Sequence, residues 1–179
     1  EHDLAGSLVG LVGFGDIGKQ TAKRLKNWGC KVVYNDILEM SPEIEEEYGA
    51  TSMEFDELIR TCDIISMHVP VTPLTTGMLG KEQFAAMKKT VLVINTSRGP
   101  VIDQDALIWA LENDEIYGAA LDVVTPEPLP DDAPILNMSE KAMDKIIITP
   151  HVAGVTNEDF ERMTKMSFQA VERVLSGKE

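Results

Sequence analysis

Cysteine, long apolar runs and basic side chains are all scarce in this chain. Its two cysteines, Cys30 and Cys62, lie at the boundaries of apolar runs and have no metal-like spacing. They predict reduced, packed thiols in a cytoplasmic protein, with no metal site. No apolar stretch approaches the ~18 residues that span a bilayer. Lysine and arginine number 16 against 30 acidic residues, and the net charge of −14 argues against a nucleic-acid partner or an anionic membrane surface.

A signal peptide, an initiating methionine and internal repeats are also missing from the sequence. The 179 residues suffice for one domain of ordinary size with a real core. Because the chain starts at Glu1 without a methionine, we expect it to be part of a longer protein.

Short apolar runs alternate with amphipathic segments along the chain. The runs read as buried strands and are residues 8–12, 31–35, 64–67, 91–95, 118–122 and 146–149. The segments between them predict helices over residues 17–28, 42–48, 55–60, 81–87 and 103–113. This order predicts an α/β fold with a doubly wound, mostly parallel sheet in three layers, a Rossmann-type dinucleotide-binding domain over residues 1–179.

A last helix is predicted after Thr156, which can cap it, and it ends at Gly177. Its apolar residues recur at helical spacing, and methionines such as Met163 are expected to fill the core. The Pro- and Asp-rich stretch 124–145 is either a functional loop or a short-helix insertion.

A glycine motif follows the first apolar run. Gly13 allows a tight turn, Gly15 lets the backbone approach a pyrophosphate, and Gly18 lets the next helix pack closely on the strand. Asp36 lies 18 residues past Gly18, where a carboxylate can accept hydrogen bonds from ribose hydroxyls. Although the glycines alone could form a plain turn, the strand, helix and acid together predict binding of NAD. A 2′-phosphate would be repelled by Asp36.

Polar residues follow the other strands, at the edge where parallel sheets bind ligands. Arg98 offers a fork-shaped donor to a carboxylate, although it could simply cap a strand end. Glu127 is flanked by prolines and could orient an imidazole, or it could be an exposed loop residue. His151 could transfer a proton near neutral pH, or be an ordinary hydrogen-bonded loop histidine. His68 and Pro70 indicate a loop that shapes the cofactor pocket.

Taken together, these residues provide a carboxylate anchor, a proton carrier and its support on a dinucleotide scaffold. The chain resembles the nucleotide-binding domain of the D-isomer-specific 2-hydroxyacid dehydrogenases over essentially its whole length. The segments that carry the resemblance are 13–18, 68–75, 95–99 and 149–151.

The resemblance implies a role for each of these positions in hydride transfer between NAD and C2 of a 2-hydroxy or 2-keto acid. Arg98 would bind the substrate carboxylate and keto oxygen, His151 would carry the hydroxyl proton, and Glu127 would pair with His151. The cofactor contacts that it implies are Asp16 and Ile17 at the pyrophosphate, Thr75 nearby, and Asp122 with Thr96 at the nicotinamide carboxamide. Glu127 would also distinguish the chain from the formate dehydrogenase branch.

Two departures from the family pattern affect these expectations. Residues 137–145 make the connection between Glu127 and His151 longer than usual, so their pairing is inferred. The family's substrate domain, built from sequence on both sides of this one, is absent, so we expect weak turnover by this chain alone.

The resemblance also implies a homodimer. An NAD(H)-sensing binding module related to the transcriptional corepressors is the main alternative, and an L-hydroxyacid dehydrogenase fits the residue order poorly.

Overall fold

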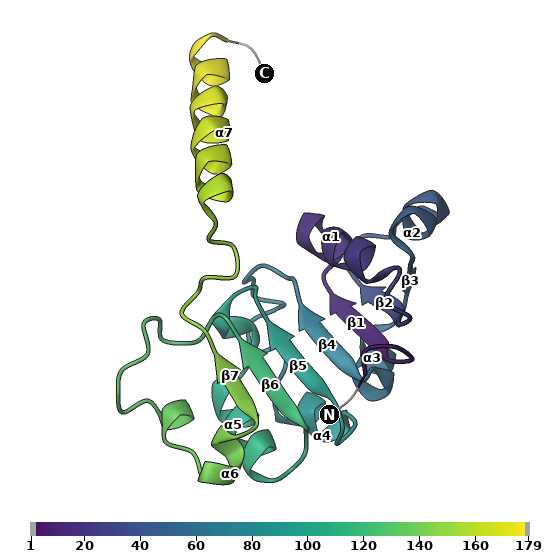
Figure 1. The fold of residues 1–179 in the computed structure, drawn as a ribbon, viewed down its shortest axis with the longest axis vertical. Helices are drawn as coiled ribbons and strands as arrows, with labels where there is room; N and C mark the ends of the chain where they lie inside the picture. Colours follow the sequence, from purple (N-terminus) through teal and green to yellow (C-terminus); the bar gives the residue numbers. More distant parts are fainter. Residues whose placement is uncertain (1–2, 178–179) are drawn as a thin grey trace.

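The computed structural model describes residues 3–177 and contains one seven-stranded parallel sheet of order β3-β2-β1-β4-β5-β6-β7 (Figure 1). The strands are β1 (Leu8–Val12), β2 (Lys31–Asn35), β3 (Ala50–Ser52), β4 (Ile64–Met67), β5 (Leu92–Asn95), β6 (Gly118–Leu121) and β7 (Ile146–Ile148). The predicted doubly wound fold is confirmed, and six strands lie where the sequence indicated. Strand β3 was not predicted, because it is three residues long and mostly exposed and so lacks an apolar run.

The helices are α1 (Asp16–Leu25), α2 (Pro42–Tyr48), α3 (Phe55–Thr61), α4 (Lys81–Ala86), α5 (Gln104–Glu112), α6 (Glu140–Met143) and α7 (Asn157–Leu175), with 3-10 turns η1 (Gly99–Val101) and η2 (Pro134–Leu136). Two apolar clusters lie on opposite faces of the sheet, because neighbouring strand residues point to opposite sides. The larger cluster joins β1, β2, β4, β5 and β6 to α3, α4, α5, η2 and α6. The smaller one joins β1–β3 to α1 and α2.

On the face of the sheet that carries the smaller cluster, helices α1 and α2 therefore cover only strands β1–β3. Beyond them, side chains from β5, β6 and β7 line an open hollow of about 640 Å³. Leu92 and Ile94 are half-buried, and Ile147 is 67% exposed. The predicted three layers are thus complete over only part of the sheet. The uncovered part of this face is apolar and consists of residues 92, 94, 120 and 147.

Helix α7 extends away from the rest of the fold (Figure 1). Thr156 caps it as predicted, with its hydroxyl oxygen accepting a hydrogen bond from the Asp159 amide at 3.0 Å. None of its residues is buried, and Met163 is 61% exposed. The prediction that its methionines fill the core was wrong, because helical periodicity shows that one face is apolar without showing what covers it.

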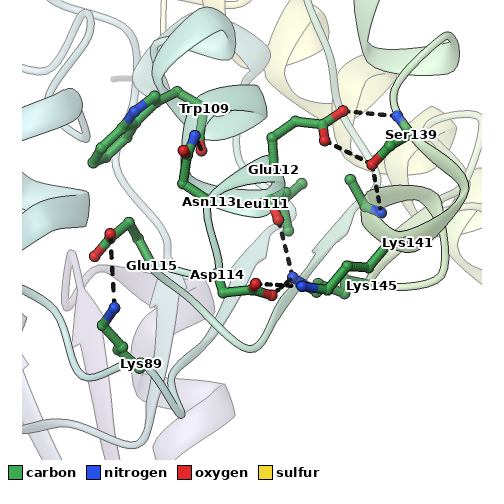
Figure 2. A network of polar contacts seen from close by, with 11 residues as sticks. Lys89, Trp109, Leu111, Glu112, Asn113, Asp114, Glu115, Ser139, Lys141 and Lys145 are labelled. Carbon is green, nitrogen blue, oxygen red and sulfur yellow. Dashed lines mark hydrogen bonds and ion pairs between the residues drawn. The ribbon is translucent and has the colours of Figure 1, made fainter.

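The irregular stretch between β6 and β7 is fastened to the end of α5 (Figure 2). The Glu112 carboxylate accepts hydrogen bonds from the Ser139 amide at 2.7 Å and its hydroxyl at 2.6 Å. Asp114 pairs with both Lys141 and Lys145. These contacts fix the long connection on which the predicted pairing of Glu127 with His151 depends.

Candidate functional site

The three glycines of the first loop meet three different steric demands. Gly13 has a left-handed φ of +99°, and a Cβ there would lie 2.6 Å from the His68 carbonyl oxygen. A Cβ on Gly18 would lie 2.3 Å from the Gly13 carbonyl oxygen, so the helix could not pack as it does. Nothing lies within 4 Å of a Cβ built on Gly15. The loop therefore needs glycine at Gly13 and Gly18 for its own conformation, while Gly15 borders open space.

Asp36 lies directly beside this loop. Its Oδ2 atom accepts a hydrogen bond from the Phe14 amide at 2.6 Å, and its Oδ1 atom accepts one from the Leu38 amide at 3.0 Å. The register between β1 and β2, which pairs Val12 with Asn35, accounts for this proximity. The carboxylate is thus oriented by backbone donors before any ligand arrives.

A cavity of about 740 Å³ opens where the glycine loop, the end of β4 and the end of β5 meet. Its lining includes the predicted positions Gly15, Asp16, Ile17, His68, Pro70, Thr96 and Arg98. Helix α1 begins here without a side-chain cap, which leaves amides at the positive end of the helix dipole free for an anion. Open space at Gly15 and uncapped amides suit the pyrophosphate of a dinucleotide.

His68 and Thr75 take different places around this cavity. Burial lowers the pKa of His68 to about 4, so its imidazole is neutral near pH 7, and Ser66 Oγ lies 3.0 Å from its Nε2. Thr75 does not line the cavity. Its hydroxyl donates to the Pro70 carbonyl at 2.6 Å and accepts from the Thr72 amide at 2.8 Å, which stabilises the loop itself.

The turn that carries Arg98 is organised by Asn95, which lies in the segment 95–99 but to which the sequence alone assigned no role. Asn95 is buried; its Nδ2 donates to the Arg98 carbonyl at 3.0 Å, and its Oδ1 accepts from the Ser97 amide and hydroxyl. Within residues 3–177, no carboxylate forms an ion pair with the exposed Arg98. The signal available in the sequence was a polar amide closing a buried apolar strand.

The structure brings Glu127 and His151 together despite the long connection between them. His151 Nδ1 and Glu127 Oε1 are 2.8 Å apart, and the two side chains are 46% and 40% exposed. An ionised carboxylate only accepts hydrogen bonds, so Nδ1 carries the proton and Nε2 of the neutral imidazole is left as an acceptor. The arrangement suits proton exchange with a group placed at Nε2.

Asp122 is buried at the end of β6, beside the loop that carries His151. Its Oδ1 atom accepts hydrogen bonds from the Thr149 hydroxyl at 2.5 Å and the Val152 amide at 2.9 Å, and its Oδ2 atom accepts one from the Ala153 amide at 2.9 Å. Burial alone would raise the pKa of Asp122, but these three donors and the nearby His151 together outweigh it and lower the pKa below the ordinary value. The group is therefore ionised near neutral pH.

The described part of the chain contains neither a metal-binding cluster nor a membrane-spanning helix. Residues 3–177 contain no cluster of three or more His, Cys, Asp or Glu side chains that could hold a metal ion. Over the same residues, no helix is both long and apolar enough to cross a membrane.

The fold and these side chains define a dinucleotide-binding α/β domain with a paired histidine and glutamate at the ligand-binding edge of its sheet. Residues 1–153 match the family described as D-isomer specific 2-hydroxyacid dehydrogenase, NAD binding domain. The chain belongs to this family.

Relatives and solved structures agree with this assignment. The chain is 38% identical over 165 residues to a glyoxylate reductase of Korarchaeum cryptofilum, covering 92% of this chain and 48% of the relative. It is also 38% identical over 179 residues to the formate dehydrogenase of Arabidopsis thaliana, covering 99% and 45%. The crystal structure of D-lactate dehydrogenase with NAD+ from Lactobacillus jensenii superposes with a TM-score of 0.87 at 34% identity, covering 100% of this chain and 56% of that one. The chain thus spans about half the length of these relatives.

Proposed function

We propose that the protein containing this domain transfers a hydride between NAD and C2 of a D-2-hydroxy or 2-keto acid. The observation that carries the proposal is the 2.8 Å contact between His151 Nδ1 and Glu127 Oε1. It leaves Nε2 able to take a proton from a hydroxyl in oxidation, and the protonated imidazole returns a proton in reduction. Membership of the family supports the same chemistry.

The substrate's carboxylate has a partner of suitable shape in Arg98. Arg98 borders the cavity, and one nitrogen of its guanidinium donates to the Ser97 carbonyl at 2.6 Å. The remaining donors form a planar fork that matches a carboxylate. We assign Arg98 to anchor the acid so that C2 faces the cofactor site.

When bound, NAD supplies the hydride acceptor or donor for this reaction. The amides of Asp16 and Ile17, at the uncapped start of α1, would hold its pyrophosphate. Asp36 would accept the ribose hydroxyls and disfavour a 2′-phosphate by charge repulsion. Pro70 and Thr96 border the same cavity, whereas Thr75 would act by shaping its loop.

A second domain would complete the substrate pocket. Support comes from the coverage of the relatives, about half their length, and from helix α7, whose apolar side chains are all exposed. Phe160 is 69% exposed and Val174 is 79% exposed. Exposed apolar side chains of this size are typical of a helix that packs on another domain or chain. We therefore expect this chain alone to bind NADH and to turn over poorly.

Turnover tests the proposal directly. The full-length protein is assayed with NADH and a panel of 2-keto acids, beside a His151→Ala variant whose NADH binding is checked by fluorescence titration. We expect the variant to bind NADH and to lose turnover by about 10²–10⁴-fold. Turnover unaffected by the substitution contradicts the role of His151, and a wild-type protein that binds NADH but reduces no keto acid favours the NAD(H)-sensing module.

Cofactor choice has its own test. Replacing Asp36→Ser together with Ile37→Arg removes the carboxylate and adds a cation at the ribose end. We expect NADPH to bind better than NADH, and an unchanged preference shows that Asp36 does not meet the ribose.

Overall identity does not separate reductases of keto acids from formate dehydrogenases, because both reach 38%. We propose that Glu127, beside His151, places this protein with the former. The homodimer implied by the resemblance and the cytoplasmic location indicated by the two cysteines stay predictions.

A further inference from the structure

We infer that Asp122 is a positioning residue for His151: its buried carboxylate holds the loop of residues 149–153 in the conformation that presents the imidazole to Glu127. The inference rests on the proposed function of His151 as the proton-transfer group, and it adds a role for Asp122 to the contact with the nicotinamide carboxamide that the resemblance implies.

Asp122 grips the loop on both sides of His151. The Thr149 hydroxyl donates to it from two residues before the histidine, and the amides of Val152 and Ala153 donate to it from directly after. All three donors lie at 2.5–2.9 Å. Asp122 is itself only 5% exposed and follows the buried strand β6, so its carboxylate cannot move to accommodate another loop conformation.

His151 needs such a constraint because of its backbone. Its φ is +54°, in the left-handed region that residues with a Cβ rarely adopt. A conformation of this kind persists where surrounding contacts over-determine it, and such residues cluster at functional sites. The three hydrogen bonds to Asp122 supply that constraint.

Glu127 is a poor candidate for the same task. The side chains of the His151–Glu127 pair are 46% and 40% exposed, and an exposed ion pair contributes little to holding a loop. Glu127 selects the tautomer once the ring is in place, whereas Asp122 brings the ring into place. If the hydrogen bonds between Asp122 and the loop are lost, His151 should therefore populate both neutral tautomers, even without cofactor.

The carboxylate also keeps one acceptor position open. An ionised carboxylate offers about four lone-pair positions, and three are occupied here, two on Oδ1 and one on Oδ2. The free position on Oδ2 could accept an amide N–H from the carboxamide without displacing the loop. One side chain would then link the cofactor pocket to the loop that carries the proton.

Imidazole NMR tests the inference without cofactor or substrate. In the two-bond ¹H–¹⁵N spectrum of the ¹⁵N-labelled chain, wild-type His151 should show a single neutral tautomer protonated at Nδ1. Asp122→Asn keeps the shape but removes the charge and turns an N–H toward the loop donors. We expect mixed tautomers of His151 and faster amide exchange at Val152 and Ala153, and an unchanged His151 signature overturns the inference.

A second pair of variants avoids any direct change to the carboxylate. In the full-length protein, Thr149→Val removes one of the three donors, and Thr149→Ser retains it. We expect Thr149→Val to lower kcat about 10-fold with little change in the KM values, and Thr149→Ser to restore it. A Thr149→Val enzyme with wild-type kcat, or a defect in KM alone, contradicts a positioning role.

The two proposals fail in different ways. If His151→Ala retains turnover, the proposed proton-transfer function is wrong, whatever the tautomer spectrum of the isolated chain. If His151→Ala is inactive while Asp122→Asn leaves the His151 spectrum unchanged, only the positioning role is wrong.

Discussion

The stability of the fold should depend on pH through His68. Burial lowers its pKa from an ordinary 6.5 to about 4, because the imidazolium would lose part of its hydration in the wall of the cavity. The unfolded chain therefore binds a proton at a higher pH than the folded chain does. Between these two values the folded state binds fewer protons, so the free energy of unfolding falls as the pH is lowered.

The magnitude follows from the two pKa values. Linkage gives a loss of about 2 kcal/mol at about pH 5 and about 3 kcal/mol at about pH 4, relative to neutral pH. This is a sizeable part of the stability of an ordinary domain, about 5–15 kcal/mol. The contribution is complete above about pH 6.5 and is lost progressively as the pH falls to about 4, which is the opposite of a histidine stabilised by a carboxylate.

Urea unfolding followed by circular dichroism at neutral pH and near pH 5 measures this loss. In His68→Gln the side-chain amide can still reach Ser66 but does not titrate, so the variant should lose about 2 kcal/mol less than the wild type over this interval. Ser66→Ala is the control: it removes the hydrogen bond seen at 3.0 Å but leaves the burial, so its pH dependence should match the wild type. Parallel pH profiles for wild type and His68→Gln would refute the argument.

Three further predictions concern packing, a helix cap and a thiol. Gly99→Ala would place a Cβ 2.0 Å from the Val124 carbonyl oxygen, so thermal unfolding should show a loss of about 2 kcal/mol or more, whereas Gly154→Ala, with nothing within 4 Å, should not. Thr156→Ala removes the cap of α7 and should cost that helix about 1 kcal/mol, which faster amide exchange in its first turn would report; unchanged exchange contradicts the cap. Burial raises the pKa of the Cys62 thiol to about 12, so a thiol reagent should modify it only after unfolding in urea, and rapid labelling of the folded chain contradicts this.

The strands and the glycine loop could be predicted because local sequence determines them. Apolar runs such as Leu8–Val12 and Ile64–Met67 form strands buried in a parallel sheet, and both lie where the sequence indicated. Gly13 and Gly18 are required by the backbone itself, whose atoms leave no room for a Cβ. Strand β3 escaped notice because three mostly exposed residues leave no periodic signal.

The organisation of the site was harder to predict from the sequence, because it depends on hydrogen bonds between residues far apart in the chain. Asn95 orders the turn of Arg98, and Asp122 grips residues some 30 positions further along the chain. Such partners cannot be read from spacing, since the sheet register decides which strand ends meet. Sequence could nominate Glu127 and His151, but their separation depends on how the long connection is fastened at Glu112 and Asp114.

The order of strands and helices, the dinucleotide loop with its acid, and the residue types available for chemistry could all be read from the amino-acid sequence. These properties depend on backbone sterics, apolar periodicity and the identity of single side chains, which are local. Three features became visible only in the tertiary structure: α7 has no buried residue, part of one sheet face is uncovered, and Asp122 accepts hydrogen bonds from the loop of His151. Those properties depend on which surfaces meet in space, and a pattern of apolar and polar residues specifies that a face will be covered without specifying by what.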